Sequence, residues 1–398
     1  MSGRYLNSVL LLTPLLFLNA DFPGRIITDE DTPPPTVKSV LDKPLKAPPG
    51  YYQKIVVKKD AEYSCPQFPK PYTGPLVFAF EGDDGSGAYI NKKSASRYLK
   101  AAVPIRELES LSASITRDFI RGSGVAARDC LIDLLYAWAK VNALQHREIN
   151  PVGQAMRKWA LAATGSHYLQ ITQLNSGLPA ADARKRKLIE KWFARQAAQV
   201  VAYYSGRDSA KADNHDYWAA WAVMVTAVNL QDRELYDWAV NKYRAAVRQI
   251  DRQGYLPNEI KRKSRALTYQ NFALQPLVML AVFAESNDDF LPKEHAALER
   301  LAEKVVAGIN NPRIFQSVTG KEQKMDGMIT EGSLAWIPVW RAYFDPHVVA
   351  PLDRRINSFK SARLGGNTAW LFKHKKQPKP KTRVARKKIY DKHVMLKE

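Results

Sequence analysis

Apolar residues recur at intervals of three and four over most of the chain, from about residue 95 to residue 345. Clear examples are residues 130–138 and 218–225, where the apolar positions follow the turn of an α-helix. Polar loops with Gly, Asn, Asp or Pro separate about ten such segments, at roughly the spacing of helical hairpins. Only residues 54–57 and 76–80 indicate short extended segments. The pattern therefore predicts an all-α fold.

The N-terminus has the layout of a secretory signal peptide. Arg4 precedes a largely apolar run at residues 9–18, and Ala20 offers a small residue for cleavage. The alternative is a buried N-terminal helix. The run is too short to cross a bilayer as a helix, and we expect no membrane span elsewhere. We therefore assign residues 1–20 to a signal peptide and expect an exported protein.

Two further segments lack the helical pattern. Residues 21–50 are rich in proline and charge, which predicts an extended linker. Residues 373–398 combine low hydrophobicity with high charge, which predicts a disordered basic tail. Residues 51–372 remain as the folded domain.

The charge of the chain points to a polyanionic partner. The chain has 398 residues, 45% of them hydrophobic, and its 60 Lys and Arg against 39 Asp and Glu give a net charge of +21. Eleven of the basic residues but only two acidic ones lie after Leu371, so the domain is basic without the tail. Nucleic acid, an acidic polysaccharide and an anionic membrane surface are the candidates. Nucleic acid is disfavoured because the chain is expected to be exported and has no base-reading module.

Several kinds of chemistry lack the residues they need. Two cysteines, Cys65 and Cys130, are too few for a four-cysteine zinc or iron–sulfur site, and in an exported protein they would most simply form one disulfide. The seven histidines show no standard metal spacing. The chain also lacks a glycine-rich phosphate loop and a GxSxG motif, so nucleotides, redox cofactors and serine hydrolysis have no support.

Two segments carry candidate chemistry. Residues 214–221 (NHDYWAAW) place an amide, an imidazole and two indoles at the start of an apolar helix. In residues 254–272, Arg265, Tyr269 and Phe272 are spaced to share one face of a helix. Taken alone, the first segment is more typical of packing, and the second of a solvated basic face, than of a catalytic site.

A series of segments, in one order along the chain, resembles the mannuronate-specific alginate lyases of polysaccharide lyase family five. The matching segments are residues 48–52 (PPGYY), 71–74 (PYTG), 156–161 (MRKWAL), 192–195 (WFAR), 214–221, 256–259 (LPNE), 265–267 (RAL) and 363–366 (RLGG). The resemblance implies an incomplete α/α toroid with a long substrate cleft, a periplasmic location, and neither a metal nor another cofactor. Cys65 and Cys130 fall where the family has a cysteine pair.

The resemblance also implies roles for individual residues. A uronate-polymer lyase removes the weakly acidic C5 proton and expels the 4-linked sugar, so the sugar carboxylate must first be neutralised. Asn214, His215 and Arg265 match the family positions that do this. A tyrosine then acts as both base and acid in the family. The residues expected to bind substrate are Lys158, Trp159, Trp218, Phe272 and Arg363.

This sequence departs from the family at the catalytic tyrosine. That position, seven residues after Arg265, holds Phe272, which cannot transfer a proton. Tyr269, one turn away, and His215 are the candidates to replace it. The lid segment, residues 76–91, looks about two residues shorter than in the family and is acidic, and Asn150-Pro151-Val152-Gly153 replaces a His-Thr-Gly run.

Two functions follow from these observations. The first is a periplasmic polysaccharide lyase that cleaves a uronate polymer by β-elimination, either alginate or a glucuronate-containing exopolysaccharide. The second is a lyase-like protein that binds an anionic polysaccharide without cleaving it, as a partner in exopolysaccharide export.

The basic tail provides a first test. Truncation after Phe372 should leave the thermal unfolding midpoint unchanged, because the removed residues lack apolar periodicity. It should weaken the salt-sensitive retention of the protein on an anionic polymer column, because it removes a large positive charge. A large fall in the unfolding midpoint would contradict the assignment.

Overall fold

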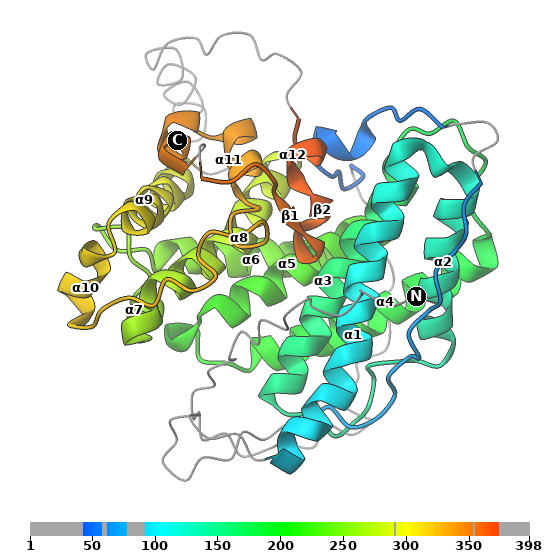
Figure 1. Ribbon diagram of the computed structural model, residues 1–398, viewed down its shortest axis with the longest axis horizontal. Helices are drawn as coiled ribbons and strands as arrows, with labels where there is room; N and C mark the ends of the chain where they lie inside the picture. Colours follow the sequence, from blue (N-terminus) through cyan, green and yellow to red (C-terminus); the bar gives the residue numbers. More distant parts are fainter. Residues whose placement is uncertain (1–42, 58–61, 78–91, 290–291, 353–354, 374–398) are drawn as a thin grey trace, which may run out of the picture.

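The computed structural model describes residues 43–57, 62–77, 92–289, 292–352 and 355–373 (Figure 1). The longer helices are α1 (Lys92–Asp118), α2 (Gly124–Lys140), α3 (Pro151–Gln173), α4 (Ala183–Ser205), α5 (Asn214–Leu230), α6 (Arg233–Arg248), α8 (Ala266–Glu285) and α9 (Pro292–Asn310). The short elements are α7 (Pro257–Ile260), α10 (Arg313–Thr319), α11 (Ile337–Tyr343), α12 (Thr368–Leu371) and the strands β1 (Lys360–Ser361) and β2 (Gly366–Asn367). The all-α prediction is confirmed.

Three helices, α3, α5 and α8, form the centre of the molecule. Nearly every residue of each is buried. This is expected of α5 and α8, which are largely apolar, whereas α3 also buries polar side chains such as Lys158 and His167. The segment Lys263–Glu285, which includes α8, is long and apolar enough to cross a membrane, but 83% of its apolar window is buried inside the molecule. It is therefore a core helix.

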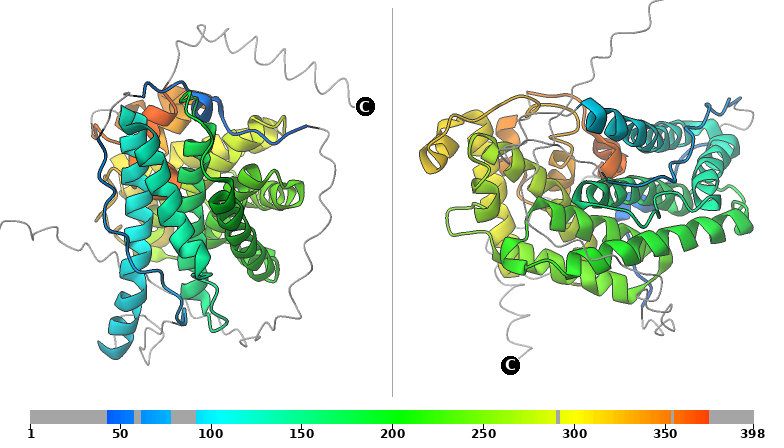
Figure 2. Two further views of the ribbon diagram at one scale, coloured as in Figure 1. Left: turned by 90° about the vertical axis from the view of Figure 1, so that its right-hand side faces the viewer. Right: turned by 90° about the horizontal axis from the view of Figure 1, so that it is seen from below.

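The other long helices pack around this centre in consecutive antiparallel pairs. Helices α1 and α2, α3 and α4, α5 and α6, and α8 and α9 each contact their partner (Figure 2). Helix α5 also contacts α3 and α8, which links successive pairs. The helical hairpins expected from the spacing of apolar segments are therefore present.

The N-terminal segment is part of the domain from about residue 45 onward. Leu45 and Ala47 are buried, and the backbone N–H of Leu45 donates to Gln231 Oε1 at 2.8 Å. The Tyr51 ring lies 5.6 Å from that of Phe283. The predicted boundary between linker and domain, at residues 50 and 51, was therefore too late, because proline-rich sequence can pack as well as extend. The signal peptide, most of the linker and the basic tail lie outside the described residues and stay predictions.

Each of the two segments predicted to be extended, residues 54–57 and 76–80, forms one isolated β-bridge in the described part of the chain. Lys54 forms one parallel bridge with Asn175, and Leu76 forms another with Ile149, just before α3. The part of the second segment after residue 77 lies outside the described residues.

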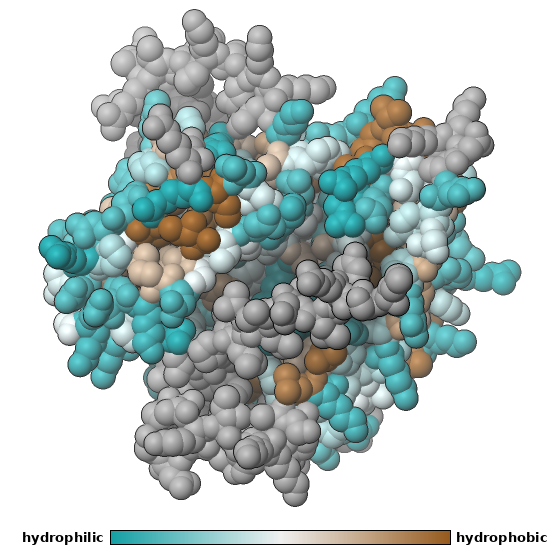
Figure 3. All heavy atoms as spheres, in the orientation of Figure 1, coloured by the Kyte–Doolittle hydropathy of each residue, from teal (hydrophilic) through white to brown (hydrophobic). Residues whose placement is uncertain are grey.

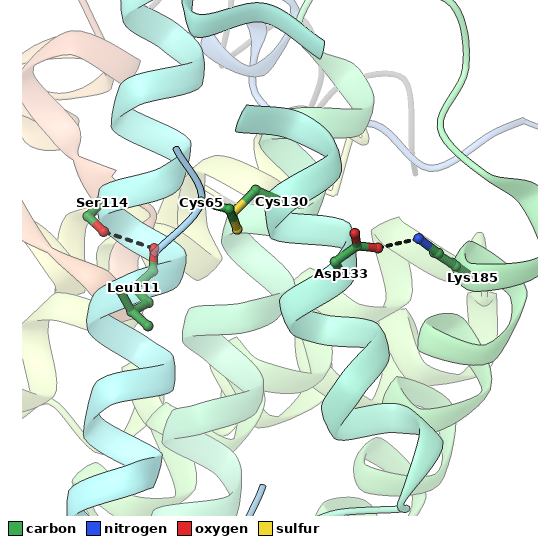
Figure 4. Close-up of a disulfide and its surroundings, with 6 residues drawn as sticks. All are labelled: Cys65, Leu111, Ser114, Cys130, Asp133 and Lys185. Atoms are coloured by element: carbon green, nitrogen blue, oxygen red, sulfur yellow. Dashed lines mark hydrogen bonds and ion pairs between the residues drawn. A yellow bond between two sulfur atoms is a disulfide. The ribbon is translucent and has the colours of Figure 1, made fainter. Parts of the chain in front are cut away.

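The cysteine prediction is confirmed. Cys65 and Cys130 form a disulfide with their Cα atoms 5.7 Å apart, which joins the N-terminal segment to α2 (Figure 4). Three residues further along the same helix, the Lys185 ammonium pairs with the Asp133 carboxylate and links α2 to α4.

The surface is recessed near the middle of the face seen in Figure 3. This recess lies between the part of the molecule that carries α1 and α2 and the part that carries α9 and α10.

The N-terminus of α3 depends on a close backbone approach at Gly153. A Cβ atom at this position would lie 2.1 Å from the carbonyl oxygen of Leu76 and 2.9 Å from Ile149 Cγ1. Gly153→Ala should therefore force α3 and the Leu76 bridge apart, and should destabilise the fold by about 1–3 kcal/mol in thermal unfolding.

Gly206→Ala is the matched control. Gly206 has a φ of −77° and its nearest neighbour to a new Cβ is 3.7 Å away, so this variant should unfold close to wild type. Equal effects of the two alanines would contradict the steric explanation.

Candidate active site

The first turn of α5 is fixed by a reciprocal cap. The Asp213 carboxylate accepts the backbone N–H of His215 at 3.0 Å, and the Asp216 carboxylate accepts the backbone N–H of Asp213 at 3.2 Å. This capping box sets where Asn214 and His215, the first two residues of the helix, point their side chains.

Cations from three other segments hold the two capping carboxylates. Arg207 Nη1 lies 2.6 Å from Asp216 Oδ2, and Arg262 Nη2 lies 3.0 Å from Asp213 Oδ2. Lys242 Nζ approaches Asp216 Oδ1 at 3.6 Å. Since buried carboxylates are costly unless they are paired, these cations allow the cap to be charged inside the protein.

His215 lies over Lys158, a residue of the central helix α3. Lys158 Nζ is 2.9 Å from His215 Nδ1 and 2.9 Å from the His215 carbonyl oxygen. Burial lowers the pKa of His215 well below its ordinary value, so the imidazole is neutral at pH 7. Lys158 itself is completely buried. It therefore contacts His215 from inside the protein and does not reach solvent. The expectation that Lys158 contacts the polymer is not met.

Asn214 is paired with a buried carboxyl group, Glu259 of α7. The backbone N–H of Asn214 donates to Glu259 Oε1 at 2.6 Å, and its side-chain Nδ2 lies 3.1 Å from the same oxygen. Burial raises the pKa of Glu259 to about 7, and the nearby Asp213 charge acts in the same direction. In this structure the amide of Asn214 is therefore directed to Glu259.

An aromatic cluster places Phe272 beside His215. The Trp159 ring lies 6.0 Å from the His215 imidazole and 6.2 Å from the Phe272 ring. Trp218 packs on the other side of Phe272 at 5.1 Å, and its Nε1 donates to the Phe272 carbonyl oxygen at 3.1 Å. Helices α3, α5 and α8 thus each contribute a side chain to one cluster.

The segment at residues 363–366 brings an arginine to the same cluster. The Arg363 guanidinium lies 4.4 Å from the centre of the Trp159 ring, and its Nε donates to Glu109 of α1 at 3.0 Å. Gly365 and Gly366 have φ values of 91° and 85°, which glycine adopts without strain. Because neither glycine has a side chain, this segment can pass close to α3, which explains why two glycines follow Arg363 and Leu364.

Arg265 and Tyr269 differ from expectation. Arg265 closes a 3-10 turn (Lys263–Arg265) and is the N-cap of α8, one residue before the helix that carries Tyr269 and Phe272 begins. Its Nε is buried without a hydrogen-bond partner among the described residues. Tyr269 lies under Arg262, whose Cζ is 4.7 Å from the ring centre. Burial outweighs the arginine charges and raises the pKa of Tyr269, so this phenol is a weaker acid than usual.

Trp218, which was expected to bind substrate, does not reach the surface, and neither does Trp221 of the same segment. Trp218 and Trp221 are fully buried, and their Nε1 groups donate to backbone carbonyls within the core. Trp159 is also largely buried, but it contacts both His215 and Arg363. The structure thus brings together His215, Lys158, Trp159, Phe272 and Arg363, with Asn214 adjoining them.

Two participants, Glu259 and Tyr204, were missed as functional candidates. Glu259 lies in the matching LPNE segment, but its burial against Asn214 is a tertiary feature. Tyr204, at the end of α4, bonds to Lys158 at 2.6 Å and has no local sequence signal.

A separate pocket of about 290 Å³ lies where residues 174–181 cross α2 and α3. Two arginines, Arg128 and Arg186, line it together with apolar and backbone groups. Of the described residues that line it, none is a histidine, tyrosine or carboxylate. Proton transfer therefore fits the first turn of α5 better.

Comparisons with known proteins identify the family. The family model "Alginate lyase" matches residues 81–315. An alginate lyase of Pseudomonas aeruginosa is 39% identical over 334 residues, which cover 82% of this chain and 90% of the relative. An alginate lyase of Pseudomonas putida strain W619 is 40% identical over 342 residues, which cover 84% and 93%. The chain belongs to the alginate lyase family.

The solved structures of alginate lyases share the fold. Alginate lyase A1-III from Sphingomonas species A1 has a TM-score of 0.68 at 24% identity, and the match covers 84% of this chain and 91% of that one. A tyrosine-to-phenylalanine variant of A1-III complexed with a tetrasaccharide also has a TM-score of 0.68, at 23% identity, covering 79% and 88%. The α/α toroid is therefore confirmed, and by family the chain is a polysaccharide lyase.

The buried Glu259 of this alginate lyase homologue should make stability fall as pH rises. The pKa of this carboxyl is higher in the folded protein than in the unfolded chain, so its ionisation favours unfolding. The free energy of unfolding should therefore fall between about pH 4.5 and pH 7. Glu259→Gln removes this titration. The free energy of unfolding of Glu259→Gln minus that of wild type should therefore be larger at pH 8 than at pH 5, by at most about 3 kcal/mol.

Glu303→Gln, on the exposed face of α9, is the control for this series. Its difference from wild type should be the same at both pH values. A Glu259→Gln difference that does not change with pH would disprove the buried titration.

Proposed function

We propose that this protein cleaves a uronate polymer, with alginate as the first candidate, by β-elimination in the periplasm. Membership of the alginate lyase family supports the reaction class. The disulfide and the signal-peptide pattern support an oxidising location outside the cytoplasm.

The observation that carries this proposal is the position of His215. Its imidazole is partly exposed, one ring nitrogen is held by Lys158, and the ring adjoins the aromatic cluster that contains Phe272. A neutral imidazole can remove a proton, so His215 offers at this place the function that a phenylalanine ring lacks.

The remaining residues fit the needs of the reaction. The sugar carboxylate must lose charge before the C5 proton becomes acidic enough to leave. The Arg265 guanidinium, whose Nε is buried without a hydrogen-bond partner in the described part of the chain, is the donor available for it, since the Asn214 amide is directed to Glu259. His215 then takes the C5 proton, and the C4–O4 bond breaks as the leaving oxygen is protonated. Arg363, which is partly exposed and lies over the Trp159 ring, can bind a neighbouring sugar carboxylate.

One observation favours a second function. Phe272 occupies the position at which the resemblance places the catalytic tyrosine, and it fits between Trp159 and Trp218. A protein that binds an anionic polysaccharide during export, without cleaving it, needs no group there. The positive charge of the chain serves either function.

Ultraviolet absorbance of the unsaturated uronate product separates the two functions. We expect wild type to cleave at least one of polymannuronate, polyguluronate and glucuronan, and His215→Ala to lower the rate by roughly 10²–10⁴-fold. Phe272→Tyr should raise the rate, because it adds a phenol beside His215. His347→Ala, an exposed histidine outside the cluster, is the control and should match wild type.

The second function would be favoured if neither wild type nor Phe272→Tyr cleaves any of the three polymers while both still bind them. Wild-type cleavage that survives His215→Ala would exclude histidine as the base.

A further inference from the structure

The Lys158 amino group is a junction between three helices. From α3, its Nζ lies 2.6 Å from Tyr204 Oη of α4, 2.9 Å from His215 Nδ1 of α5 and 2.9 Å from the His215 carbonyl oxygen. The side chain is completely buried. None of the residues that hydrogen-bond it, among those the structure describes, contributes a carboxylate.

The protonation state of this amino group decides which nitrogen of His215 carries a proton. The carbonyl oxygen only accepts, and the Tyr204 hydroxyl can donate or accept. An ammonium group has three donors and no acceptor, so it would force Nδ1 to accept and would leave the proton on Nε2. A neutral amine has a lone pair, so it can accept Nδ1–H and leave the lone pair on Nε2.

The surroundings of Lys158 favour the neutral amine. Burial is the largest influence on the pKa of Lys158 and lowers it well below the ordinary value. Asp213 and Asp216 act to raise this pKa, whereas the charges of Arg207 and Arg363 act to lower it. The two carboxylates are themselves paired with Arg207, Arg262 and Lys242, so they compensate a further buried charge poorly.

We propose that Lys158 is a positioning residue whose neutral amine accepts Nδ1–H of His215 and thereby holds the Nε2 lone pair toward the substrate. This inference rests on the proposed function of His215 as the base. It assigns Lys158 a role in place of the polymer contact expected from the sequence.

The proton balance of the reaction is simple with this arrangement. His215 Nε2 takes the C5 proton, the C5–H electron pair forms the C4=C5 double bond, and the C4–O4 bond breaks with its pair on O4. The imidazolium then gives the same proton to O4 and is neutral again. Lys158 keeps its two protons throughout, and its lone pair stabilises the imidazolium through Nδ1–H, which offsets the weak basicity that burial gives His215.

Two substitutions separate this role from one based on positive charge. Lys158→Arg keeps a cation that can only donate, so it should force the proton to Nε2 and lower the rate by about 10²-fold or more. Lys158→Gln offers an amide oxygen that can accept Nδ1–H, so it should lower the rate by only about tenfold or less. If the reaction instead needed a positive charge at this position, Lys158→Arg would be faster than Lys158→Gln. Lys191→Gln, exposed on α4, is the control for loss of a cation.

A spectroscopic measurement can determine the protonated nitrogen of His215 whether or not the protein cleaves a polymer. Nitrogen-15 shifts of ring-labelled histidine distinguish a protonated from an unprotonated ring nitrogen, and the missing signal of His215→Ala assigns the residue. We expect neutral His215 with Nδ1–H in wild type and Lys158→Gln, and with Nε2–H in Lys158→Arg.

The outcomes are distinguishable. Nε2–H in wild type, or a faster Lys158→Arg than Lys158→Gln, overturns the role of Lys158. Nδ1–H in wild type without cleavage of any polymer supports the positioning and refutes only the proposed function. Should Lys158→Arg fail to fold, the wild-type and Lys158→Gln spectra still decide.

Discussion

A buried amino group on the central helix α3 ties together the parts of the molecule on which the chemistry depends. Lys158 contacts the end of α4 and the beginning of α5, so the first turn of α5 cannot move relative to α3 without breaking its bonds. The capping carboxylates of that turn are in turn held by Arg207 and Arg262. The position of His215 therefore follows from buried polar contacts between helices and not from a loop.

The aromatic cluster provides a second, apolar constraint at the same place. Trp159 and Trp218 enclose Phe272 from two sides, and Trp218 also bonds to the Phe272 backbone. The cluster thus stabilises contacts among α3, α5 and α8 whatever group stands at position 272. A tyrosine could be replaced there by phenylalanine with little loss of packing, because only the hydroxyl changes.

Much of the fold could be predicted from periodicity, since α2 and α5 follow their apolar spacing closely and pair into hairpins. The disulfide could be predicted because the chain has only one pair of cysteines. The turn that ends at Arg265 could not be predicted, because Lys263 takes a φ of 52° and starts a 3-10 turn, a local break that apolar spacing does not reveal.

Burial of polar residues was the main feature that the sequence could not provide. Lys158 was expected to contact the polymer because its segment resembles the family, and Glu259 was not singled out, yet both are fully buried, which is unusual for lysine and glutamate. Both are buried because groups distant in the chain, Tyr204 and Asn214, supply their hydrogen bonds. Trp218 was expected to bind substrate because its segment resembles the family, and the sequence did not show that nearly every residue of α5 is buried.

The disulfide changes what happens if the chain is cut. Cys65 and Cys130 are 65 positions apart, and the whole of α1 lies between them. A single break of the backbone anywhere in that interval leaves two fragments that remain one covalent molecule. For a break between α1 and α2, the N-terminal fragment would also stay packed on the rest of the domain, because α1 contacts both α2 and α3. A chain cut there would therefore be a two-chain form whose helical pairs remain assembled.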